Sequence, residues 1–113
     1  MRTSNVQVSK GHIVMALTGR DEGRWFLTVD EQQGEFLFLA DGETRHMTRP
    51  KKKNVRHVRI LGKLDDAEKT LLEVYGMKDA GQREAAIRTC IHRYRQSWEE
   101  RAARIAAKAK EEA

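Results

Sequence analysis

The sequence of 113 residues contains one cysteine and one proline, and it has no long apolar run. Cys90 has no second cysteine to pair with, which disfavours a small secreted domain, since these usually need several disulfides. The longest apolar runs, residues 13–17 and 36–40, have five residues each, whereas a helix needs roughly 20 to cross a bilayer. No apolar segment typical of a signal peptide follows the first methionine. We therefore expect a cytoplasmic protein without a membrane-spanning segment.

The sequence also has no group of residues typical of an active site or a metal site. It contains neither a P-loop nor a Gly-x-Ser-x-Gly motif. The adjacent acids Asp21 and Glu22 are expected in a solvated turn. The histidines are scattered, and no two of them have the helical spacing that favours zinc. They are His12, His46, His57 and His92. We expect neither an enzyme nor a metal or other cofactor.

Positive charge is what the sequence has in excess, and it is unevenly distributed. The net charge is +5. Residues 1–63 contain twelve Lys and Arg against seven Asp and Glu, whereas residues 64–113 contain ten of each. Residues 44–63 hold eight cations and no acid. Such a segment favours a polyanionic partner, nucleic acid before an anionic membrane surface, although a solubilising loop is the simpler alternative.

The first half of the chain has the pattern of five short strands in an α+β protein. Segments with the pattern of strands, at residues 12–18, 24–29, 36–40, 44–48 and 55–61, are punctuated by turns at Gly19–Gly23, Asp30–Gly34 and Asp41–Gly42. The fourth segment ends at Pro50. Five short strands predict a small barrel better than a sandwich. The aromatic residues are assigned to its core, with Trp25 as the one aromatic that is also a candidate for base stacking. They are Trp25, Phe26, Phe36 and Phe38.

The second half, residues 64–113, predicts a helical extension. Asp65 with Glu68 is typical of a capping box, and Gly76 is a stop signal. A second helix is expected from about Gln82 to the end. Its apolar stripe has spacings of 4, 3, 4, 4, 3 and 4 residues, which favours a nearly straight helix. The bulky first half should dock on the barrel and the last turns should project, while Cys90 is expected as a buried thiol. The stripe is Ile87, Ile91, Tyr94, Trp98, Ala102, Ile105 and Ala109.

Residues 10–24, with the sequence Lys-Gly-His-Ile-Val-Met-Ala-Leu-Thr-Gly-Arg-Asp-Glu-Gly-Arg, resemble a KOW motif. Residues 37–45 and 49–57, which include Ala-Asp-Gly and Arg-Pro-Lys-Lys-Lys, are similar to a branch of small bacterial KOW proteins. These proteins are related to KOW-bearing large-subunit ribosomal proteins of archaea and eukaryotes. The resemblance covers roughly residues 8–61. It implies a five-stranded SH3-like barrel over residues 1–63 that binds RNA, most often ribosomal RNA.

The candidate RNA-binding residues combine the turn and the basic segment. Two functions remain open. The first is binding of ribosomal RNA or association with the ribosome. The second is a role as a protein-interaction module of the translation or transcription machinery, as in NusG-type KOW domains. Ribosomal or other proteins are candidate partners of the C-terminal helix. We expect a monomer. The candidates are Arg20, Arg24, Arg45, Arg49, Lys51, Lys52, Lys53, Arg56, His57 and Arg59.

Overall fold

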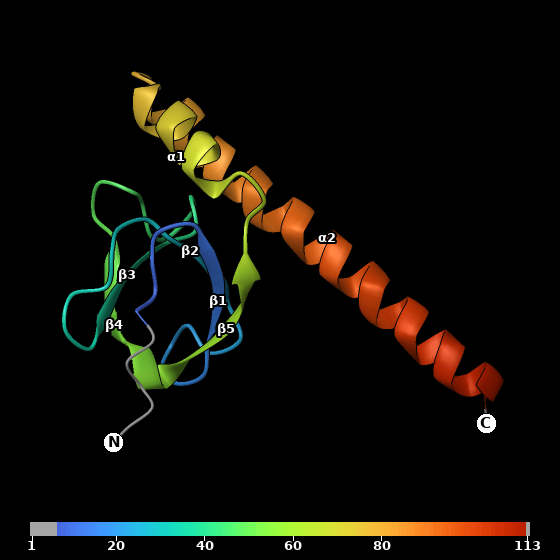
Figure 1. The fold of residues 1–113 in the computed structure, drawn as a ribbon. Coiled ribbons are helices and arrows are strands. Elements are labelled where there is room, and N and C mark those ends of the chain that lie inside the picture. The colour runs from blue at the N-terminus through green and yellow to red at the C-terminus, as the bar shows by residue number, and fades with distance from the viewer. Residues whose placement is uncertain (1–6, 113) are drawn as a thin grey trace.

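The computed structural model describes residues 7–112, with the side chains of all of these except residues 67, 68 and 112. It is an α+β protein with five strands followed by two α-helices, and a short 3₁₀ helix lies before the last strand (Figure 1), which confirms the predicted class. The strands are β1 (His12–Ala16), β2 (Trp25–Thr28), β3 (Phe36–Ala40), β4 (Lys51–Asn54) and β5 (Val58–Lys63). The helices are the 3₁₀ helix η1 (Val55–His57), α1 (Ala67–Gly76) and α2 (Ala80–Glu112). No described helix is long and apolar enough to cross a membrane.

The strands form one antiparallel sheet in the order β4-β3-β2-β1-β5. Hydrogen bonds do not close this sheet into the predicted barrel, because among the described residues no strand pairing joins β4 to β5. These two edge strands are instead joined through η1. The chain therefore passes from one edge of the sheet to the other within three residues.

Both faces of the sheet are apolar, and each carries its own core. Phe26 is fully buried on one face, inside the curled sheet. Its neighbours there are Val8, Val14, Ala16, Leu37, Leu39 and Val58. Trp25 and Leu27 alternate with Phe26 along β2, so they lie on the other face, where the helices pack. The helices contribute Leu71, Val74, Ile87 and Ile91. The sheet thus depends on the helices to cover its second face.

Helix α2 docks through its first half and projects through its second (Figure 1). Ile87 and Ile91 are buried, and Tyr94 and Trp98 are half-buried. The Trp98 ring meets the Trp25 ring edge-on with centroids 5.6 Å apart. Residues 99–111 are all exposed, and Ile105 is 64% exposed. The expected division of the apolar stripe is confirmed.

The fourth strand was predicted in the wrong place. Residues 44–48 lie in a loop, and β4 begins after Pro50 instead of ending before it. The cause is Asp41, whose Oδ1 accepts the backbone N–H groups of Thr44 at 3.0 Å and Arg45 at 2.9 Å. A carboxylate that binds the backbone in this way holds a turn in place of an extended strand.

Two further boundaries differ from the sequence prediction. The fifth strand begins at Val58, because Asn54 Oδ1 accepts the Arg56 N–H at 2.9 Å and starts η1. The N-cap position of α1 is occupied by Asp66, so the predicted cap at Asp65 is wrong. Asp66 has a left-handed backbone (φ 51°), and its side chain makes no hydrogen bond to the first turn of the helix. The Glu68 side chain, the other half of that capping box, lies outside the described residues. Gly76 ends α1 as predicted.

Candidate nucleic-acid interface

The β1–β2 loop, residues 17–24, is the predicted glycine turn, and it lies against η1. Gly19 and Gly23 have φ values of 84° and 85°, which strain any residue with a Cβ. The Gly23 N–H donates to the Ala16 carbonyl at 2.8 Å, which closes the turn. The Leu17 N–H donates to the His57 carbonyl at 2.9 Å. The turn and η1, far apart in sequence, are therefore fixed side by side.

Asp21 lies at the centre of this loop and is buried, so the prediction that it is solvated was wrong. Its Oδ2 accepts Lys51 Nζ at 2.5 Å and Arg45 Nη2 at 3.4 Å. The hydrogen bond from Lys51 is the main reason that the pKa of Asp21 is lowered, and it acts against the effect of burial. Two of the predicted RNA-binding cations thus neutralise an internal carboxylate.

A second acid, Asp41, holds a third candidate. Arg24 Nη1 lies 3.3 Å from Asp41 Oδ2 and 3.2 Å from Thr44 Oγ1. Burial alone would raise the pKa of Asp41, but hydrogen bonds from the N–H groups of Arg45 and Glu43 outweigh it, and the pKa is lowered. Arg24 therefore ties the glycine turn to the start of the β3–β4 loop.

The three lysines of β4 do not form the free basic loop that the sequence suggested. Alternate residues of a strand point to opposite faces, so Lys51 and Lys53 face the glycine turn. Lys53 Nζ donates to the Thr18 carbonyl at 2.8 Å. Lys52 faces the other way and is exposed, with Nζ 4.4 Å from the centre of the Phe36 ring. Of the three lysines, only Lys52 makes no contact with the β1–β2 loop through its ammonium group.

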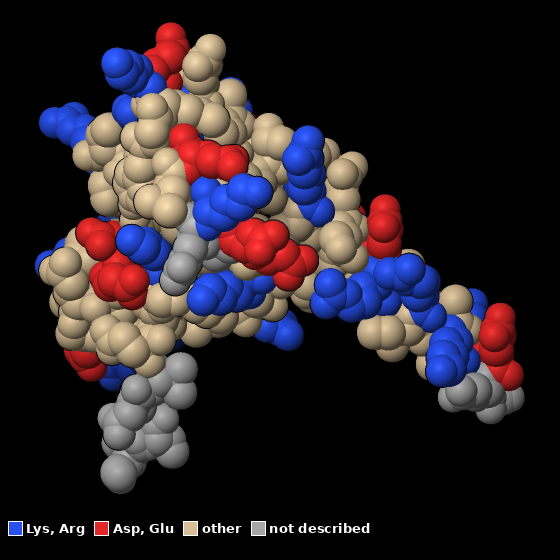
Figure 2. Space-filling model, turned by 45° about the horizontal axis from the view of Figure 1, so that its top comes forward, with Lys and Arg blue, Asp and Glu red and all other residues tan. Residues whose placement is uncertain are grey.

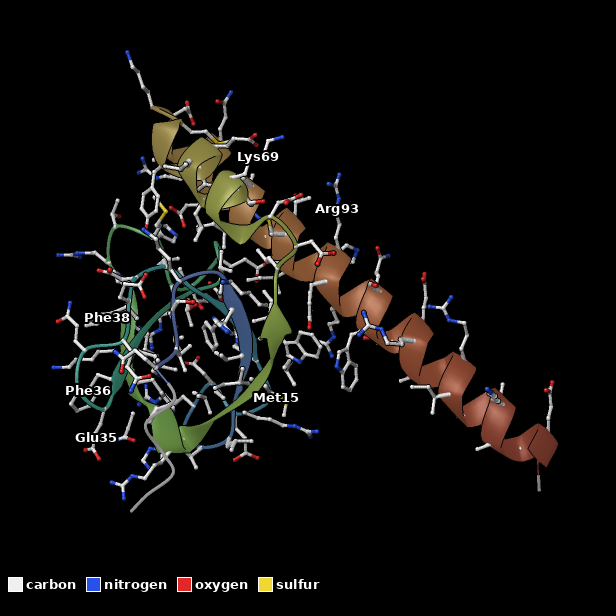
Figure 3. The ribbon with its side chains drawn as sticks, in the orientation of Figure 1. Met15, Glu35, Phe36, Phe38, Lys69 and Arg93 are labelled. Carbon is white, nitrogen blue, oxygen red and sulfur yellow. The ribbon has the colours of Figure 1, made fainter. Side chains whose placement is uncertain are left out.

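The remaining candidates are exposed, and among the described residues their side chains form no ion pair with an acid. Most of them gather around η1, and we call Arg20, Arg56, His57 and Arg59 the η1 cluster. Arg59 extends the cluster along the edge strand β5, where it pairs with Met15 of β1 (Figure 3). Arg49 is separate, because it precedes β4 at the end opposite to η1.

The surface around η1 also contains an exposed aromatic ring and an acid. Phe36 is 36% exposed and pairs with Asn54 of β4, next to η1. Sequence reasoning assigned Phe36 to the core, although its alternation with the buried Leu37 marks the outer face. Trp25 is buried against α2, which confirms its assignment to the core and removes it as a candidate for base stacking. Glu35 contributes an exposed carboxylate beside Phe36 (Figure 3).

The joint between the β3–β4 loop and α2 was not found from the sequence. Glu84 is buried, and its Oε1 accepts the Met47 N–H at 3.1 Å. Arg88 Nη1 donates to the Gly42 carbonyl at 2.5 Å. A Cβ on Gly42 would collide with the Glu84 carbonyl of the helix backbone. The only available signal was the Asp41-Gly42 pair, which predicted a hairpin turn but gave no information about α2.

Charge is mixed on the face of the protein that Figure 2 shows. Lys and Arg are interleaved with Asp and Glu on the body, and both kinds of charge also occur along the projecting part of α2. Cys90 is half-buried, not fully buried as expected, and burial raises the pKa of its thiol. No group of three or more metal-ligating side chains occurs within the described part of the chain. No protein-family model and no curated protein sequence matches this chain.

Proposed function

We propose that this protein binds RNA through a KOW-type SH3-like fold formed by residues 1–63, and that it acts in the cytoplasm. Three features support this fold. The strand order places β1 between β2 and β5, a 3₁₀ helix joins β4 to β5, and a glycine turn lies between β1 and β2. That turn contacts β4 through the Asp21–Lys51 ion pair and the hydrogen bond from Lys53 to the Thr18 carbonyl. It contacts η1 through the backbone hydrogen bond from Leu17 to His57, so it bridges the gap that the hydrogen bonds of the sheet leave open.

The observation that carries the proposal is the η1 cluster. Its cations are exposed and have no acidic partner among the described residues, whereas Arg24, Arg45 and Lys51 are held by Asp21 and Asp41. Exposed Arg and Lys side chains suit phosphate oxygens, and phosphate contacts supply much of the affinity of RNA-binding proteins. Next to the cluster, Phe36 and Lys52 offer a ring and a cation to an unpaired base. The resemblance to KOW proteins favours ribosomal RNA as the ligand.

The test is a salt titration of RNA binding by the full chain. Arg56→Gln together with Arg59→Gln removes two cations of the η1 cluster. Because each phosphate contact contributes roughly 0.7 to 0.9 to the slope of log affinity against log salt, the double variant should flatten the slope by about 1.5. The matched control, Lys78→Gln with Lys110→Gln, removes the same charge from exposed positions outside the cluster.

The ligand is a structured ribosomal RNA fragment, and binding is measured between about 50 and 200 mM salt. The cluster variant should lose more affinity than the control at every salt concentration. Equal slopes for the two double variants would refute the assignment of the η1 cluster. Wild-type binding that is absent or independent of salt would refute the RNA-binding function itself.

A second candidate function is a protein-interaction module of the translation or transcription machinery. The observation that favours it is the outer face of α1, where Leu72 is 73% exposed and Tyr75 is 45% exposed. Exposed apolar side chains next to each other on a helix are typical of a protein contact. Under this alternative the protein binds ribosomes or polymerase but shows no salt-dependent binding to bare RNA. Leu72→Ser should then abolish the association, whereas the η1 cluster variant should not.

A further inference from the structure

The projecting part of α2 carries a basic face of its own. Arg101, Arg104, Ile105 and Lys108 have the spacing i, i+3, i+4 and i+7, which places them on one face of the helix. All four side chains are exposed. In the part of the chain that the structure describes, none of these three cations has an acidic partner, although Arg95 earlier on α2 pairs with Glu99 at 3.0 Å.

This basic face begins in a groove between the β5–α1 connection and α2. The groove has a volume of about 480 Å³. Three cations line it, Lys63 at the end of β5 and Arg93 and Arg101 on α2, against one acid, Asp65. The Arg93 side chain points away from the sheet (Figure 3). Arg101 belongs both to this groove and to the exposed face of α2, so the cations of the groove and of the helix follow one another in one basic path. Figure 2 shows Lys and Arg along the projecting helix, with Asp or Glu side chains beside them.

We propose that this path binds the phosphate backbone of RNA as a second contact surface, separate from the η1 cluster. We call its cations the α2 row: Lys63, Arg93, Arg101, Arg104 and Lys108. The proposal rests on the RNA-binding function proposed above, and it assigns to the C-terminal helix an RNA contact in place of the protein contact expected from the sequence.

The chemistry of the face favours RNA over a protein. The cores of protein interfaces are depleted of charge and rich in aromatic residues, whereas this face offers one large apolar side chain, Ile105, among cations. Arg101 and Lys108 lie about 10 Å apart along the helix axis, at about 1.5 Å per residue, and can therefore contact separate phosphates. Glu100, one turn before Arg104, is not ion-paired with it in the described residues. The cations remain available to a polyanion.

The test compares two double variants of the full chain. Arg101→Gln with Lys108→Gln removes two cations of the α2 row, and Lys78→Gln with Lys110→Gln is the control of equal charge. Glutamine preserves helix propensity, and circular dichroism at 222 nm checks that α2 is intact. For a structured ribosomal RNA fragment, the α2-row variant should flatten the slope of log affinity against log salt by about 1.5. Its affinity at about 100 mM salt should fall tenfold or more, while the control changes much less.

The outcomes separate this inference from the function on which it rests. If the η1 cluster variant weakens binding but the α2-row variant behaves as the control, the second surface is refuted and the RNA-binding function stands. If the wild-type protein binds no RNA, both are refuted. If the α2-row variant keeps the wild-type affinity but changes the elution volume in size-exclusion chromatography, the face is an interface between copies of this chain. That result also overturns the inference.

Discussion

The contact between Gly42 and α2 makes a specific prediction about stability. Gly42 has a φ of 79°, and a Cβ there would meet the Glu84 carbonyl and the Arg88 side chain. Gly42→Ala therefore has two costs. The left-handed backbone costs about 1–2 kcal/mol for a residue with a Cβ. Displacing a packed helix backbone costs a further 1–3 kcal/mol or so, in the range of overpacked cores.

Gly34→Ala separates these two costs. Gly34 also has a positive φ, 62°, but nothing lies within 4 Å of the position that its Cβ would occupy. This variant should lose only the backbone contribution of about 1–2 kcal/mol. The difference between the two variants, about 1–3 kcal/mol, measures how tightly α2 is held on the β3–β4 loop.

The assay is urea unfolding followed by tryptophan fluorescence, because Trp25 and Trp98 meet across the contact between sheet and helix. For a chain of this size each kcal/mol corresponds to a shift of about 4 °C in Tm, which provides an independent measurement. Equal losses for Gly42→Ala and Gly34→Ala would show that α2 does not press on Gly42. The docked position of the helix would then be wrong.

Two further predictions concern Trp98 and Asp21. Trp98→Ala should lower the free energy of unfolding by about 2 kcal/mol, roughly half the value for a fully buried aromatic residue. Ile105→Ala on the projecting part should lower it by less than about 0.5 kcal/mol. Equal losses of the two variants in thermal unfolding would show that Trp98 does not pack. The lowered pKa of Asp21 stabilises the fold above the unfolded pKa of about 3.9, and this stability should be lost as the pH falls through the folded value. Asp21→Asn should be about 1 kcal/mol less stable at neutral pH, since its partners are partly exposed, and should flatten this acid dependence; an unchanged acid transition would contradict the role of Asp21.

The periodic elements could be predicted from the sequence, because their patterns report which face is buried. The residues of β3 were identified from a short apolar run between two turns, and the docked stripe of α2 was identified from helical spacing. The strand at residues 44–48 was not, because the Asp41 carboxylate captures the backbone N–H groups that a strand would use. A local pattern contains no information about a side chain that competes for the backbone in this way.

The candidate site was predicted in composition but not in detail. Counting charges along residues 44–63 found no acid, yet Asp21 is brought beside Lys51 and Arg45 by the fold. The sequence could not distinguish the cations that are ion-paired with Asp21 or Asp41 from the exposed ones, because these ion pairs join segments that are distant in the sequence. Phe36 was missed for a related reason, since an apolar strand in an open sheet need not be covered on both faces along its whole length.

The position of β5 has a consequence for how the protein folds. β1 is an inner strand of the sheet, paired with β2 from the next turn and with β5 from the end of the β half. Until β5 is available, one side of β1 keeps its backbone hydrogen-bonding groups unpaired. Contacts between distant segments slow folding, and unpaired strand edges promote aggregation. The sheet therefore cannot be completed during synthesis until residues 58–63 have been made. The turn η1, which precedes them, directs β5 to the free edge of β1.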